Sequence, residues 1–181
     1  MKTLAASLLV LCAIGFGFQS AAQDIDDFTL SGDDAVAAKS STEISVNAAE
    51  QIAKACVSWA EERGRRVSVV ILGLGGNIVY AYRMDGQLPA NIDTAQMKAE
   101  TALYFRISSH AALNRYTNTG STSQIIKLNQ YLVEGGLPIM VGDEMIGAVG
   151  VGGYYQNDEI CAHHALTTVI GPQPPLVADS S

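Results

Sequence analysis

Three histidines, His110, His163 and His164, are the side chains of this sequence best suited to metal binding or proton transfer near neutral pH. The last two fall in a segment, 158–170, whose pattern predicts a helix. Residues four apart share a face of a helix, so Glu159 and His163 could hold a metal ion together. No third ligand is apparent from the sequence, and a surface ion pair of Glu159 and His163 explains the same spacing.

Glycines are concentrated in the stretch GDEMIGAVGVGGYY, residues 142–155. A dinucleotide-binding fingerprint places its glycines at the turn from a strand directly into a helix, with an acidic residue about 20 positions later. Here Gly150, Gly152 and Gly153 are followed by YYQN before the next predicted helix, and the preceding unit is a hairpin. The glycines therefore indicate a strand beside a cleft, approached closely by another backbone or by a ligand.

The other groups that could do chemistry have simpler explanations. Paired carboxylates at 143–144 and 158–159 fall at a predicted hairpin tip and at a helix start, where turns and caps account for them. Glu134 precedes a GlyGly turn, and a capping role explains it. No Ser, His and Asp arrangement typical of a hydrolase is recognisable.

Residues 1–22 predict a secretory signal peptide, with the basic Lys2, an apolar run from Leu4 to Phe18, and small residues before a cleavage point at Gln23. Removal of 22 of the 181 residues leaves 159, enough for one domain, and the loss of Lys2 takes the formal net charge from −7 to −8. This acidity disfavours nucleic acid as a partner. No later segment predicts a membrane span, and we expect a periplasmic or secreted protein.

Cys56 and Cys161 remain after the predicted leader. An exported protein can form a disulfide between them. Both, however, lie on apolar stripes of predicted helices, where an unpaired cysteine behaves as a small hydrophobic residue. The sequence favours two buried thiols, with a bridge as the alternative.

Hydrophobic periodicity and turn residues predict an alternation of helices and antiparallel strands. The predicted helices start at 42 or 45 and end at 64, and span 92–106 and 158–170; the predicted strands span 67–73, 77–83, 137–141 and 145–153. The polar segment 107–132 indicates a short helix with a long loop, or a lid, that contacts a ligand. Residues 23–41 and the Pro-rich 171–181 are predicted tails of a domain that spans 42–170.

Two stretches resemble a known family of small domains. YRMDGQLPANIDTAQMKAETALYF (82–105) and EGGLPIMVGDEMIGAVGVGGYYQNDEICAHHAL (134–166) are similar to the GlcG and HbpS family of heme-binding domains, which includes the C-terminal domain of PduO corrinoid adenosyltransferases. The resemblance covers about residues 42–170. It implies an α+β fold, a profilin-like three-layer α/β/α sandwich with an antiparallel sheet of about five strands, often assembled into homo-oligomers.

The resemblance also implies heme as the cofactor, in a cleft formed by the 92–106 helix, the 107–132 segment and the glycine-rich strand. Heme needs an apolar slot, an axial donor and usually a cation for its propionates. The candidate cofactor-binding residues are His110, Arg83, Asp85, Lys98 and Gly150, and the candidate metal ligands are His110 and His163.

Each of these candidates also has a structural explanation. His110 could be an exposed loop residue instead of an axial donor. Arg83 could form an ion pair instead of meeting a ligand carboxylate, and Asp85 could belong only to an AspGly turn. Lys98 could cover the sheet edge with its aliphatic stem instead of pairing with a propionate.

Two functions follow as hypotheses. The first is an exported heme-binding protein engaged in heme capture, degradation or redox sensing. The second is an enzyme or accessory protein that acts on a small organic acid or carbonyl compound, with Arg83 and Lys98 holding the anion. Departures from the family favour the second: Gly73 stands where an acidic residue is common, and Ser108 and Ser109 stand where Pro-Thr is common.

Overall fold

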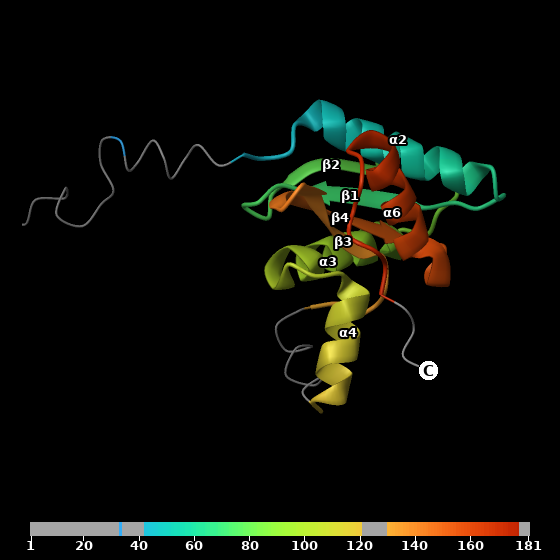
Figure 1. The fold of residues 1–181 in the computed structure, drawn as a ribbon. Helices are drawn as coiled ribbons and strands as arrows, with labels where there is room; N and C mark the ends of the chain where they lie inside the picture. The colour runs from blue at the N-terminus through green and yellow to red at the C-terminus, as the bar shows by residue number, and fades with distance from the viewer. Residues whose placement is uncertain (1–32, 34–41, 121–129, 178–181) are drawn as a thin grey trace, which may run out of the picture. The chain divides into compact units, whose positions relative to one another are not determined.

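The computed structural model describes residue 33 and residues 42–120 and 130–177 (Figure 1). The predicted leader, 1–22, and the predicted tail, 23–41, fall outside the described residues apart from residue 33. None of the helices in the described part of the chain is both long enough and apolar enough to cross a membrane.

A four-stranded antiparallel sheet lies at the centre of the unit Thr42–Ser181, with the strand order β2-β1-β4-β3. Its strands are β1 (Ser68–Leu72), β2 (Ile78–Arg83), β3 (Gly136–Val141) and β4 (Glu144–Gly152). Both predicted hairpins are confirmed, and the pairing of β1 with β4 joins them. The described sheet has four strands where the resemblance implied about five.

Helices cover both faces of this sheet, which confirms the three-layer α/β/α arrangement (Figure 1). The described helices are α2 (Val46–Glu61), α3 (Ala90–Phe105), α4 (Ser109–Asn118) and α6 (Asp158–Val169), with a short 3-10 helix, η2 (Tyr155–Asn157), before the last. α2 and α6 share one face, and α3 covers the other. Residues 121–129 of the predicted lid lie outside the described residues, and its first part forms α4.

Strand β1 shows why two cores form. It is buried along its whole length, as expected for a strand with helices on both faces. Because successive side chains point to opposite faces, Val69 and Ile71 pack with α2 and α6, while Val70 and Leu72 pack with α3. The run VSVVIL is therefore apolar apart from Ser68 and does not alternate.

The glycines of β4 and β3 bring the sheet close to α3. A Cβ atom on Gly150 would lie 1.9 Å from the carbonyl oxygen of Ala95, and one on Gly136 would lie 2.1 Å from that of Lys98. The facing side of α3 carries small residues, including Ala99, so helix and sheet meet backbone to backbone. This replaces the predicted ligand contact of Gly150 with a contact to a helix of the same domain.

Cys56 in α2 and Cys161 in α6 form a disulfide, with their Cα atoms 5.2 Å apart. The prediction of two buried thiols is therefore wrong. Both cysteines do lie on the apolar stripes of their helices, but the two helices pack side by side on one face of the sheet. The hydrophobic pattern shows that each stripe is buried and cannot show that the two stripes meet.

Candidate functional site

The start of α4 is fixed by two neighbouring serines. Ser108 caps the helix, and its hydroxyl accepts a hydrogen bond from the amide of Ala111 at 3.0 Å. The buried hydroxyl of Ser109 donates to the carbonyl of Val133 at 2.6 Å and accepts from the amide of Gly136 at 2.9 Å. The first turn of α4 is thus tied to the segment that leads into β3, and this turn carries His110.

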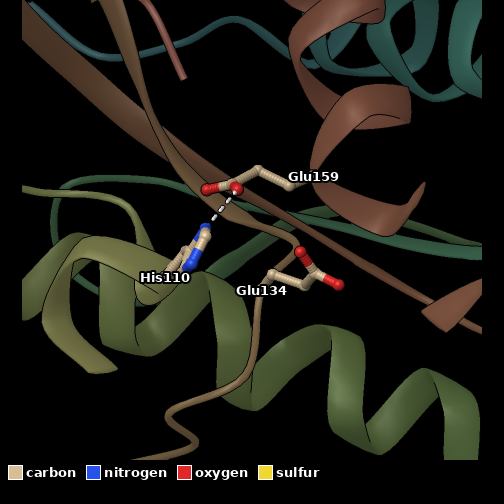
Figure 2. Close-up of side chains that lie close together, drawn as sticks. All are labelled: His110, Glu134 and Glu159. Atoms are coloured by element: carbon tan, nitrogen blue, oxygen red, sulfur yellow. Dashed lines mark hydrogen bonds and ion pairs between the residues drawn. The ribbon is translucent and has the colours of Figure 1, made fainter. Parts of the chain in front are cut away.

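His110 is buried, with 7% of its surface exposed, and pairs with Glu159 in the first turn of α6. Its Nδ1 lies 3.2 Å from Oε2 of Glu159 (Figure 2). An ionised carboxylate can only accept a hydrogen bond, so beside ionised Glu159 the proton is on Nδ1. The second carboxylate oxygen of Glu159, Oε1, is buried without a hydrogen-bond partner among the described residues.

Glu134 completes a group of three chemically active side chains. It is half-buried and lies on the segment just before β3, the segment that Ser109 holds. One ligand atom each from His110, Glu134 and Glu159 all lie within 4.8 Å of one another. Figure 2 shows the three side chains close together, each on a separate segment of the chain. The arrangement combines one imidazole with two carboxylates.

A cavity of about 560 Å³ adjoins this group. Its walls are partly apolar and partly polar, and are formed by His110, Leu113, Leu132, Val133, Glu134, Gln156 and Asn157. They come from α4, the segment before β3, and η2. The volume falls within the roughly 300–1,000 Å³ typical of small-molecule sites. Of the three walls predicted for the cleft, this cavity has only the 107–132 segment, because neither α3 nor the glycine-rich strand lines it.

The chain matches the family model described as "Haem degrading protein HbpS-like" over residues 44–167. It belongs to the HbpS-like family. It is 30% identical over 106 residues to the protein GlcG of Escherichia coli K12, which covers 56% of this chain and 78% of GlcG. The suspected relationship to GlcG and HbpS is confirmed.

Solved structures agree with this placement in the HbpS-like family. A crystal structure of HbpS superposes with a TM-score of 0.65 at 29% identity, covering 73% of this chain and 93% of that one. A structure of a PduOC complex with heme superposes with a TM-score of 0.63 at 23% identity, over 70% of this chain and 95% of that one, which shows a shared fold.

Lys98, in the first of the two stretches that resemble the family, lies in neither of the two places predicted for it. It is buried on α3, with 3% of its surface exposed, and its Nζ donates to Oδ2 of Asp158 at 2.7 Å and to the carbonyl of Val151 at 2.9 Å. Burial raises the pKa of the Asp158 carboxyl, and the ammonium of Lys98 opposes that rise. Lys98 neither reaches the cavity nor snorkels to the surface.

Arg83 and Asp85 lie at the far edge of the sheet from this site, since β2 and β3 are its opposite edge strands. Arg83 is exposed, and its guanidinium donates to the carbonyl of Gln87, which closes the loop after β2. Asp85 is an exposed turn residue. The structure therefore does not bring these two candidates together with His110.

His163 is also separate from the group. Its Nε2 lies 3.1 Å from the carbonyl oxygen of Pro174, and it lines a different, mostly apolar cavity of about 250 Å³. The predicted pair of Glu159 with His163 is wrong, because Glu159 turns toward α4 and meets His110 instead. Within the described residues, the candidate metal cluster contains His110 and not His163.

The role of Glu134 was not apparent from the sequence. His110 and Glu159 are 49 positions apart, and Glu134 lies between them on a third segment. No local spacing pattern links residues on three such segments. The sequence offers their chemical type as a signal: one histidine and two acidic residues lie next to the ends of predicted helices and strands.

Proposed function

We propose that this protein is an exported heme-binding protein of the HbpS-like family and that His110 ligates the heme iron. The observation that carries the proposal is the place of His110, buried at the wall of a 560 Å³ cavity with its ring held by Glu159. The family description, which refers to heme degradation, supports the choice of ligand. Heme bound there would supply the redox chemistry of its iron.

The described residues fit heme in two of the three features it needs. Leu113, Leu132 and Val133 give the cavity apolar walls, and His110 gives it an axial donor. A histidine whose other ring nitrogen donates to a carboxylate is a stronger and better oriented ligand. None of the described lining residues is Lys or Arg, so we expect the propionates to point toward solvent.

Hemin titration tests this proposal. We expect a saturable shift of the Soret band at micromolar protein, and we expect His110→Ala to weaken the binding at least about tenfold, or about 1.4 kcal/mol. His163→Ala is the matched control, because His163 lies in the other cavity and should leave the titration unchanged. Absence of a saturable shift in the wild type, or equal loss in both variants, would contradict the proposal.

Export and self-assembly are further parts of the proposal. The leader-like residues 1–22 and the Cys56–Cys161 disulfide both suit an oxidising compartment outside the cytoplasm. Ile78 and Tyr82 are about half exposed on the edge strand β2, which suits contact with another copy. Protein recovered from the periplasm should begin near Gln23 and scatter light as an oligomer; an intact leader or a monomer would contradict the corresponding part.

A further inference from the structure

His110, Glu134 and Glu159 have the geometry of metal ligands. Around a tetrahedral ion with bonds of about 2.1 Å, neighbouring ligand atoms lie roughly 3.4 Å apart. The ligand atoms of these three residues already lie within 4.8 Å of one another. Side-chain adjustments of about 1 Å would therefore be enough to close the site around an ion.

The unpaired oxygen of Glu159 is a second and independent observation. Glu159 is 3% exposed, and its Oε1 has no hydrogen-bond partner among the described residues. A buried carboxylate oxygen that has lost its water without gaining a donor is costly. Glu159 belongs to the group with His110 and Glu134, so a cation bound by both of its carboxylate oxygens would satisfy Oε1.

We propose that these three residues bind a divalent transition-metal ion of the Fe²⁺, Mn²⁺ or Zn²⁺ class. One imidazole nitrogen and two carboxylate oxygens suit these ions better than they suit Cu⁺, which prefers sulfur, or Ca²⁺, which prefers six to eight oxygens. Two carboxylates beside a neutral imidazole carry a charge of −2, which balances the ion. None of the described residues that line the adjoining cavity is Lys or Arg, so no permanent positive charge there competes with the ion.

The adjoining cavity distinguishes a reactive metal site from a closed, structural one. Three protein ligands leave at least one coordination position open, which is the arrangement of a reactive centre and not of a closed structural one. The 560 Å³ cavity begins at His110 and Glu134, so water or a small ligand can take that position. Gln156 and Asn157 lie in the same wall and carry amide groups of the kind that hydrogen-bond to such a ligand.

This inference does not depend on heme binding. Both proposals use His110, so heme and a bare ion should exclude each other, but each can be measured with the other absent. Cobalt binding without any hemin binding would leave the metal site standing and overturn the proposed function. Hemin binding without cobalt binding would do the opposite.

Cobalt titration of the purified, heme-free protein tests the metal site. We expect visible d–d absorption bands that saturate at one Co²⁺ per chain and are displaced by Zn²⁺. Glu134→Gln and Glu159→Gln keep the side-chain shape but remove a charged ligand, and each should weaken binding at least about tenfold, since losing even an outer-shell partner costs 10–100-fold. His163→Asn should bind as the wild type does.

Two results would overturn the metal site. One is the absence of a saturable band in the wild type. The other is a band of unchanged affinity in both glutamine variants, or one lost equally in His163→Asn, since cobalt would then be bound elsewhere. Circular dichroism of each variant checks that it is folded, and Glu134→Gln remains informative if Glu159→Gln fails to fold because Glu134 is only half-buried.

Discussion

Asp158 and Glu159 are neighbours in the first turn of α6, yet they belong to two very different buried pairs. Asp158 is fully satisfied: Oδ2 accepts from Lys98 at 2.7 Å, and Oδ1 accepts from the amide of Tyr154 at 2.8 Å. Lys98 in turn also donates to the carbonyl of Val151. Glu159 has one oxygen paired with His110 and one buried without a hydrogen-bond partner in the described part of the chain.

Helix geometry explains how adjacent residues reach such different places. Successive side chains on a helix point about 100° apart, so Asp158 is directed toward α3 and Glu159 toward α4. The first pair lies in closed packing between helix and sheet, and the second borders a cavity. Native interiors leave few buried polar atoms without a hydrogen bond. The pair of His110 and Glu159 is therefore the one expected to bind a ligand.

The largest expected effect comes from breaking the satisfied pair. Lys98→Met keeps the length of the side chain but leaves Asp158 buried without a cation and the carbonyl of Val151 without its donor. Removing one partner of a buried ion pair costs about 3–5 kcal/mol, and we expect a loss of this size in urea unfolding at pH 7.5. A loss below about 1 kcal/mol would show that this pair is not structural.

The pH dependence of the same variant should reveal its cause. Burial already raises the pKa of Asp158 above its ordinary 3.8, and Lys98→Met removes the group that opposes the rise. The folded variant then keeps a proton that the unfolded chain has lost, so it loses stability as pH rises through that raised pKa. Its deficit against the wild type should be smaller at pH 5 than at pH 7.5; a constant or larger deficit would contradict this.

The elements around both pairs could largely be predicted from the sequence, because local signals specify them. The cap at Ser45, the apolar stripe of α2 and the turn glycines between strands depend on residues a few positions apart. The family motifs added the layer order. For these reasons both hairpins and the three main helices lie within a few residues of their predicted bounds.

The pairs themselves depend on contacts that no local pattern contains. Lys98 lies off the apolar stripe of α3, and its burial follows from the close approach that Gly136 and Gly150 allow between helix and sheet. Asp158 is 60 positions from it, and Cys161 is 105 from Cys56. A sequence shows where a charged residue falls relative to the apolar stripe of its helix. The packing of the whole domain determines which distant group that residue contacts.

The smallest expected effect, and the sharpest contrast with Lys98→Met, comes from Glu159→Gln. The amide oxygen of glutamine can still accept from Nδ1 of His110, and the neutral amide costs less to bury than a carboxylate does. The change also removes one of two neighbouring negative charges, since Glu134 is close by. We therefore expect the free energy of unfolding, measured with urea and without added metal, to change by at most about 1 kcal/mol in either direction.

A loss as large as that of Lys98→Met would mean that Glu159 serves mainly to stabilise the fold, and it would contradict the distinction between the two pairs. A small change in stability together with weakened cobalt binding is the combination that a ligand-binding pair predicts and a structural pair does not.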